Sequence, residues 1–373
     1  MFKRIVFSIA LLCCAFLAGC CANKSYTVAL LGDVHFDHMK YHDMSKMKHL
    51  RIPQEKYVYN KDGFFSWRNH SIWTEINKGG SVEKNTPLNM AMWEKYMPAL
   101  LDGAAAEAEK SNVRFTIQMG DLIHGDCYDL ALNRENLQQA VKQLTSRFDK
   151  VFLVSGNHDG RGTGAAQAWN EVINTYLDGT AKNLQRKNTN YYFTVGKDLY
   201  FFYDLMNPDV DFFEQALKAN PDSRYTFFIS HVPLLPTSKR VVRDILTDDI
   251  YRLFDLLEKR NAIVLSGHTH QVSVIKYVNP ANGRRIDQLI LNSTVRYPKT
   301  QLNFKPQVNI PDPNFHPKAK KEKELWNKLY DGKITTLLHT AGTGYGILRV
   351  SDEGVFVDYR NLNSSNVYTW QLR

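Results

Sequence analysis

The sequence has few cysteines and, beyond its N-terminus, no long apolar run. Its 373 residues include five cysteines, of which three lie within the first twenty positions. Cys21 and Cys127 remain, and two thiols so far apart do not make a disulfide framework, so a buried core must hold the fold together. A membrane span needs about 20 consecutive apolar residues, which excludes a protein with several spans. No short-period repeat is present, which argues against solenoid and propeller architectures.

The charge balance is also mild. The chain carries 47 basic and 38 acidic residues, for a formal net charge of +9, and 43% of its residues are hydrophobic. This composition is typical of a globular domain and excludes a disordered or collagen-like chain. The dense basic run at 318–323 is most simply a solvated helix start or loop, and binding of an anion is the lesser interpretation. We therefore expect no nucleic-acid partner.

The first twenty residues have the three parts of a secretory signal. Lys3 and Arg4 are followed by an apolar run over 5–17, two small residues and Cys20. The final Leu-Ala-Gly-Cys also resembles a bacterial lipobox, which implies that residues 1–19 are a removed signal peptide and that Cys20 is lipidated. An ordinary signal with an incidental cysteine, or an uncleaved anchor, is the alternative. We expect an exported lipoprotein, periplasmic or at the cell surface, with lipid chains that anchor it to a membrane.

The remaining sequence predicts an α/β domain over 24–373. Five short apolar runs without strict alternation indicate strands buried on both faces, at 26–31, 113–119, 151–155, 225–230 and 262–266. Helical patterns lie between or beside them, at 87–110, 133–148, 165–177, 209–219 and 244–259. After residue 270 the patterns mainly indicate strands, so we expect a β-rich C-terminal part. Two stretches without a clear period, about 36–86 and 299–333, are predicted to be surface insertions.

Each of the five buried strands ends in residue types that bind metals. The side chains are Asp33, His35, Asp121, Asn157, His231, His268 and His270. Sites in open α/β sheets form at the carboxyl ends of strands, so we expect these side chains to converge. Carboxylates with imidazoles suit Mn, Fe or Zn. Seven ligands are too many for one ion with an open position, and they suit two ions roughly 3.5–4 Å apart that share a bridging carboxylate and a water.

The same motifs carry a family resemblance. In chain order they are Asp33-x-His35, Gly120-Asp121, Gly156-Asn157-His158-Asp159, His231 and Gly267-His268-Thr269-His270. This series resembles the calcineurin-like metallophosphoesterases over about 26–271. The resemblance implies a four-layer αββα sandwich with a dinuclear metal site. It also implies that Asp121 bridges two ions, one held by Asp33, His35 and His270 and the other by Asn157, His231 and His268.

The resemblance implies a phosphoesterase mechanism in which a metal-bridging hydroxide attacks phosphorus in line with the leaving group. His158 would stabilise the transition state or protonate the leaving oxygen, and Asp159 would orient its ring. Many members of the family have Asn or Asp two positions after the Gly-Asp motif. This chain departs from that pattern, because Leu122 and Ile123 follow Asp121 and precede His124. That departure leaves the ligand set intact and puts assignment to those subfamilies in doubt.

Other polar residues near these motifs are weaker candidates. Arg161 could bind a substrate phosphate as a bidentate donor, and His124 and Asp126 could line the cleft or be ordinary loop residues. His38 and His42 have helical spacing that could bind a further metal or a phosphate, although polar residues of an insertion are the simpler interpretation.

We therefore expect a metal-dependent phosphoesterase that acts on a small phosphorylated substrate. A phosphodiesterase is favoured over a phosphomonoesterase, because His and Arg near an open site suit a small diester or nucleotide. A non-catalytic binding lipoprotein on the same scaffold is the alternative from another class. A nuclease would need a clustered basic face, which the sequence lacks outside 318–323.

Overall fold

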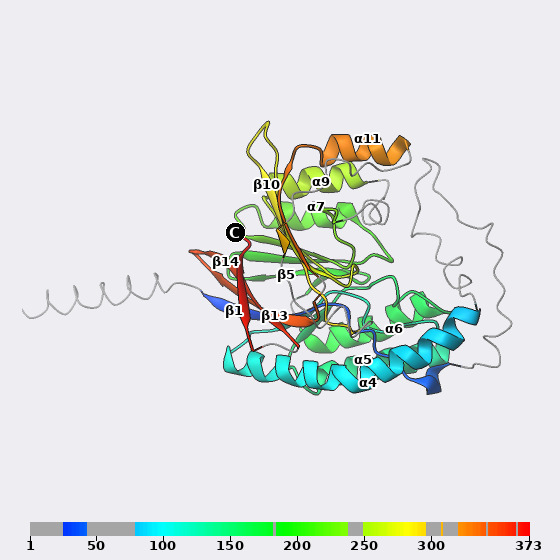
Figure 1. The fold of residues 1–373 in the computed structure, drawn as a ribbon. Coiled ribbons are helices and arrows are strands. Elements are labelled where there is room, and N and C mark those ends of the chain that lie inside the picture. The colour runs from blue at the N-terminus through cyan, green and yellow to red at the C-terminus, as the bar shows by residue number, and fades with distance from the viewer. Residues whose placement is uncertain are drawn as a thin grey trace, which may run out of the picture.

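Two β-sheets form the centre of the protein, and helices cover the outer face of each (Figure 1). The computed structural model describes residues 25–42, 79–181, 184–237, 249–295, 307–308, 320–340, 342–362 and 365–373. The predicted four-layer αββα sandwich is therefore confirmed. The expected signal peptide 1–19 and Cys20 lie outside the described residues, as do 43–78, 299–306 and 309–319 of the two expected insertions.

The first sheet has six strands in the order β15-β14-β13-β1-β2-β3. Its strands are β1 Tyr26–Leu31, β2 Thr116–Gln118, β3 Val151–Leu153, β13 Gly344–Ser351, β14 Gly354–Asn361 and β15 Val367–Gln371. β1, β2 and β3 are parallel, whereas β13, β14 and β15 add an antiparallel meander beside β1. The parallel strands are short and their residues mostly buried, because helices and the second sheet cover their two faces.

The second sheet has nine strands in the order β11-β12-β9-β10-β8-β7-β6-β5-β4. Its strands are β4 Gln185–Lys187, β5 Asn190–Val195, β6 Asp198–Tyr203, β7 Thr226–Ser230, β8 Ile263–Ser266, β9 Val272–Val278, β10 Arg285–Ile290, β11 Gln307–Val308 and β12 Ile334–Thr340. β6, β7, β8 and β10 are parallel and form its buried centre. The many strands after β8 confirm the expected β-rich C-terminal part.

Helices cover the two sheets from outside. They are the short 3-10 helix η1 Met39–Tyr41 and the α-helices α4 Gly79–Lys110, α5 Leu130–Thr145, α6 Ala165–Thr180, α7 Val210–Ala219, α9 Ile250–Lys259 and α11 Lys320–Leu329. In Figure 1, α4, α5 and α6 lie beside the six-stranded sheet and α7, α9 and α11 beside the nine-stranded sheet. Within the described residues, no helix combines the length and the apolar character that crossing a membrane requires.

Two apolar clusters fill the spaces between these layers. One lies between the two sheets and beneath α4, α5 and α6, and includes Ile117, Trp169 and Phe227. The other lies between the nine-stranded sheet and its helices, and includes Phe254 and Trp326. Burial of these side chains provides the main stabilising free energy, as expected for a chain without a disulfide framework.

The structure differs from the sequence prediction at both expected insertions. α4 begins at Gly79, inside the stretch expected to be an insertion over 36–86. α11 lies inside the stretch 299–333, and its Leu325 and Trp326 are buried in the second apolar cluster. α11 begins at Lys320, within the basic run at 318–323, as the helix-start interpretation of that run expects, whereas the burial of its apolar residues against the core was not predicted.

A buried polar contact joins the two sheets away from their carboxyl ends. The hydroxyl of Tyr26 on β1 donates to Asp198 Oδ2 on β6 at 2.8 Å and lies 2.9 Å from the hydroxyl of Tyr200. Arg224 Nε donates to the other oxygen of Asp198 at 2.9 Å. The Asp198 carboxylate is fully buried, so these partners replace the hydrogen bonds to water that it loses on folding.

Replacement of Tyr26 by Phe is expected to lower the free energy of unfolding by about 1–2 kcal/mol, since it removes one hydroxyl from a buried network while Arg224 still satisfies Asp198. Urea denaturation measures the change. Tyr192→Phe on β5, which pairs with β6, is the matched control, because its hydroxyl makes no hydrogen bond within the described residues. Equal losses in the two variants would show that the contact between the sheets contributes nothing.

Candidate metal centre

Seven polar side chains gather where the carboxyl ends of five strands meet. β1, β2 and β3 supply four of them from one sheet, and β7 and β8 supply three from the other. The side chains are Asp33, His35, Asp121, Asn157, His231, His268 and His270. The predicted convergence is therefore present, and the cluster lies at the boundary between the two sheets.

The first half of the cluster contains Asp33, His35, Asp121 and His270, whose ligand atoms lie within 4.8 Å of one another. His270 Nε2 lies 3.0 Å from Asp33 Oδ2 and 2.9 Å from His35 Nε2. His35 Nε2 in turn lies 3.5 Å from Asp121 Oδ2. Two imidazole nitrogens and two carboxylate oxygens thus face one another, a donor set that suits Mn, Fe or Zn.

Asp121 also belongs to the second half of the cluster. Its Oδ2 atom lies 3.2 Å from His231 Nε2. Asn157 Oδ1 lies 3.2 Å from His231 Nε2 and 2.8 Å from His268 Nδ1. One carboxylate oxygen therefore faces both halves, which is the arrangement that two ions with a shared ligand need.

The two buried carboxylates each present one oxygen to the cluster. Oδ1 of Asp33 accepts the backbone N–H of His268 at 2.8 Å, and Oδ1 of Asp121 accepts that of His158 at 2.7 Å. Burial alone would raise the pKa of both carboxyl groups, but the neighbouring histidines hold it well below its usual range, so both are charged. Asp33 Oδ2 is buried and accepts no hydrogen bond within the described residues. A charged, buried oxygen without a hydrogen bond is typical of a metal ligand, so the residues fit a metal ion.

The histidines are held so that their ring nitrogens face the cluster. The carbonyl of Met119 accepts a hydrogen bond from His231 Nδ1 at 2.8 Å, so Nε2 is the ring nitrogen that faces the cluster. His231 is fully buried, whereas Asn157, His268 and His270 are partly exposed. The cluster therefore opens to solvent on the side of these three residues, where a substrate can approach.

Several of these residues adopt a backbone conformation that side chains disfavour. The φ angles are +51° at His35, +51° at Asp121, +71° at His268 and +52° at His270. Non-glycine residues with positive φ are uncommon, and such strain persists only where the surrounding structure imposes it. The strain is therefore concentrated at the cluster, as is typical of functional sites.

Two of the glycines in the motifs are explained by close approach of the carboxylates. A Cβ atom on Gly156 would lie 2.1 Å from Asp121 Oδ1, and one on Gly267 would lie 2.1 Å from Asp33 Oδ1. No side chain can be accommodated at that distance. The glycines let the strand ends pass directly over the buried carboxylates.

The structure corrects the role expected for Asp159. Its carboxylate accepts the backbone N–H groups of Ile123 at 3.0 Å and Gly156 at 2.7 Å, so it ties together the loops after β2 and β3. The ring of His158 is held instead by the carbonyl of His124, 2.6 Å from Nδ1. Burial, and then the Arg161 guanidinium, lower the pKa of His158 well below its usual range, so the ring is neutral.

Arg161 lies beside the cluster but is already paired. Its Nε and Nη2 atoms donate to the two oxygens of Asp126 at 3.1 and 2.6 Å. Its Nη1 atom lies 3.0 Å from both ring nitrogens of His158. The two hydrogen bonds that were expected for a substrate phosphate are therefore made within the protein, to Asp126. The sequence had left Asp126 open as a cleft residue or an ordinary loop residue.

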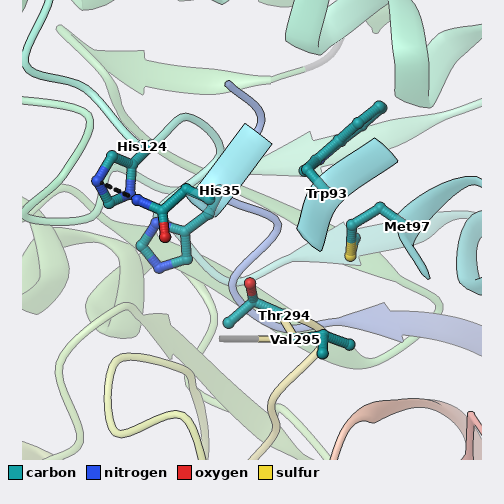
Figure 2. Close-up of a pocket in the computed structure, with 7 residues that line it drawn as sticks. His35, Trp93, Met97, His124, Thr294 and Val295 are labelled. Carbon is teal, nitrogen blue, oxygen red and sulfur yellow. Dashed lines mark hydrogen bonds between the residues drawn. The ribbon is translucent and has the colours of Figure 1, made fainter. Parts of the chain in front are cut away.

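His124 lies in a small pocket next to His35 (Figure 2). Its Nε2 atom lies 2.7 Å from Asn89 Nδ2, and Trp93 and Met97 of α4 line the other side. The sequence suggested His124 as a residue of the cleft or an ordinary loop residue, and it gave no prediction for the residues of α4 beside it. Positions 89, 93 and 97 recur at a spacing of four, which is the signal of one helix face that would have revealed them.

His38 and His42 do not form a joint site. His38 accepts a hydrogen bond from the backbone of Lys40 and begins η1. His42 turns inward, where its Nε2 atom lies 2.6 Å from Asp37 Oδ1. η1 is too short to bring the two rings to one face, so the predicted helical spacing does not apply here.

Comparisons with known proteins agree with this geometry. The family model of the calcineurin-like phosphoesterases matches residues 26–272. Purple acid phosphatase PPD1 from yellow lupin (Lupinus luteus) seeds is similar in fold, with a TM-score of 0.51 and 13% identity over 94% of this chain and 54% of its own. The structure of PhoD has a TM-score of 0.51 and 9% identity over 94% of this chain and 69% of its own. A search of curated proteins finds no match.

These two structural likenesses, at such low identity, support the fold alone. The family match covers β1 through the start of β9, and with it all seven residues of the cluster. The chain therefore belongs to the calcineurin-like phosphoesterase family and is a metal-dependent hydrolase of phosphoric esters.

Proposed function

We propose that this protein is an exported phosphodiesterase that hydrolyses small phosphate diesters at a centre of two metal ions. The observation that carries the two-metal part is the position of Asp121 Oδ2, 3.5 Å from His35 Nε2 and 3.2 Å from His231 Nε2. With Asp121 shared, the two ligand sets would be Asp33, His35 and His270 for one ion, and Asn157, His231 and His268 for the other.

When bound, two ions of Mn, Fe or Zn would acidify a water molecule and neutralise charge on the phosphoryl oxygens. The chain's own residues fix where this happens. The backbone N–H groups of His158 and His268 hold the two carboxylates in place. The phosphoryl group would enter on the side of Asn157, His268 and His270, which are partly exposed.

His158 would lie next to the bound phosphoryl group. Its Nδ1 atom is committed to the carbonyl of His124 at 2.6 Å, and the guanidinium of Arg161 lies against the ring. A ring held in this way supports an orienting and stabilising role more than delivery of a proton to the leaving oxygen. Of the two roles that the family resemblance offers, we propose the former.

The sequence favoured a diester because of an arginine near the open site, but Arg161 is paired with Asp126, and the preference rests instead on that pairing. A phosphomonoester carries a second negative charge that a diester lacks, and an additional free cation favours the monoester. Among the described residues, Arg161 is the guanidinium that contacts this site, and Asp126 already neutralises it through two hydrogen bonds. A site with its arginine occupied in this way favours the singly charged diester.

The export part of the proposal rests on residues 1–20. β1 begins at Tyr26, six positions after Cys20. A lipid on Cys20 would hold the start of the folded domain within about 20 Å of the membrane surface, since an extended chain spans at most about 3.5 Å per residue. The lipid would be the contact with the membrane, in the periplasm or at the cell surface.

Metal dependence and substrate class can be tested together. The metal-stripped protein is expected to hydrolyse neither bis-p-nitrophenyl phosphate nor p-nitrophenyl phosphate. Restoring Mn, Zn or Fe is expected to give turnover, with kcat/KM higher for the diester. The assay follows p-nitrophenol absorbance. A higher kcat/KM for the monoester would overturn the diester preference, and turnover that survives removal of all metal would overturn the two-metal mechanism.

Replacement of Asp121 by Asn is expected to reduce the bound metal from two ions per chain to one or none, because the shared oxygen loses its charge. Turnover should fall by at least about 100-fold. Elemental analysis of the purified protein gives the metal count. Asp358→Asn on β14, whose carboxylate pairs with Arg349 on the surface, is the matched control and should keep both ions. Two ions retained in the Asp121 variant would exclude it as the bridge.

Cys20→Ser is expected to move the protein from the membrane fraction to the soluble fraction and to abolish labelling with radioactive fatty acid. Cys21→Ser, one position further along, should change neither result. Fractionation and autoradiography of cells that produce each variant make the comparison. Membrane retention of the Cys20 variant without lipid labelling would favour an uncleaved anchor.

A further inference from the structure

We propose that Asp126 and Arg161 are positioning residues for His158. Residues 124–126, in the loop after β2, and residues 158–161, in the loop after β3, enclose the His158 ring between them. We call this pair of segments the His158 clasp. Through it, two side chains that touch no metal ligand would control how the ring faces the metal centre.

Contacts that involve the backbone join the two segments of the clasp. The carbonyl of His124 lies 2.6 Å from His158 Nδ1, and the backbone N–H of Asp126 donates to the carbonyl of Arg161 at 2.8 Å. Gly125 lies between these contacts with a φ of +73°, and a Cβ atom there would lie 2.2 Å from the carbonyl oxygen of His158. No side chain fits at that distance, so a glycine at position 125 is what allows the two segments to approach each other so closely.

A bidentate ion pair closes the clasp on its outer side. Arg161 donates to both oxygens of Asp126, at 3.1 and 2.6 Å, and its third nitrogen lies 3.0 Å from both nitrogens of the His158 ring. The Asp126 side chain is only 6% exposed and that of Arg161 24% exposed. A planar guanidinium held at two points has a fixed orientation, so the ring that it contacts is held on that side too.

A buried pair of side chains, His42 and Asp37, supports the backbone of Asp126. His42 Nδ1 lies 3.4 Å from the carbonyl of Asp126, and His42 Nε2 lies 2.6 Å from Asp37 Oδ1. Both side chains are fully buried. The positive φ of Asp126, +66°, is thus maintained by contacts on both sides of its backbone. This support explains a buried histidine–aspartate pair that the metal centre does not use.

The clasp acts on the site through His158. The backbone N–H of His158 donates to Asp121 Oδ1 at 2.7 Å, and its ring meets that of His35 edge-on with centroids 4.5 Å apart. Release of the ring would remove an oriented group from the reaction and leave the metal ligands in place. We therefore expect an effect on kcat, with KM and the metal count nearly unchanged.

A double-mutant cycle tests the inference with bis-p-nitrophenyl phosphate, and this arm rests on the proposed function. Arg161→Ala and Asp126→Asn are each expected to lower kcat by about 10–100-fold, as is typical of residues that orient a functional side chain. In a His158→Ala background, neither should lower kcat further. An equal loss in both backgrounds, or a rise in KM alone, would show that Arg161 contacts the substrate directly and would overturn the proposal.

A second readout needs no turnover. ¹⁵N-histidine NMR of the full-length, metal-free protein is expected to show one fixed tautomer for His158, with the proton on Nδ1, and a mixture of tautomers in Arg161→Ala. An unchanged tautomer in that variant would overturn the proposal. If the native protein hydrolyses no phosphate ester, the proposed function fails, while this measurement still decides on the clasp.

Matched variants separate positioning from loss of stability. Arg134→Ala removes another arginine–carboxylate pair, with Glu171, on the exposed face of α5. It should leave kcat and the His158 tautomer unchanged. Gly125→Ala perturbs the clasp without altering charge and should lower kcat as Arg161→Ala does. A folded Gly125→Ala protein with native kcat would contradict the inference.

Discussion

The rest of the structure depends on one carboxylate oxygen, Oδ2 of Asp121, which faces histidines from both sheets. It lies 3.5 Å from His35, which follows β1, and 3.2 Å from His231, which follows β7. A charged carboxylate with only 1% exposure carries a large desolvation cost. Metal ions between these atoms would offset that cost, and the same ions would supply the chemistry. The need to bring the atoms together explains much of the local backbone.

This constraint accounts for the strain at the strand ends. Positive φ angles at four of the seven cluster residues turn the backbone sharply after β1, β2 and β8. Gly156 and Gly267 let the chain pass within van der Waals reach of the two carboxylates. These features stabilise nothing by themselves, so the two apolar clusters and the polar contact through Asp198 must stabilise the molecule from outside the site. Stability thus comes mainly from the strands and helices, and the chemistry from the loops that follow the strands.

Much of the fold and the composition of the site could be predicted from the sequence, because both follow from local patterns. Continuous apolar runs indicate buried parallel strands, and the topology of such sheets places their carboxyl ends at one edge. The start of α4 at Gly79 and the packing of α11 against the core were missed, since the apolar positions there are few and stand among polar residues. The partners of Asp159 and Arg161 could not be predicted either. These partners depend on how the loops after β2 and β3 pack against each other, and the spacing of residues along the sequence does not predict that packing.

Two metal ions with Asp121 between them are the central feature of the proposed mechanism. A crystal structure of the manganese-loaded protein, with anomalous scattering recorded at the manganese edge, tests it most directly. The account predicts two peaks roughly 3.5–4 Å apart, each within bonding distance of Asp121 Oδ2. A single peak at the cluster, or two peaks of which only one contacts Asp121, would contradict it.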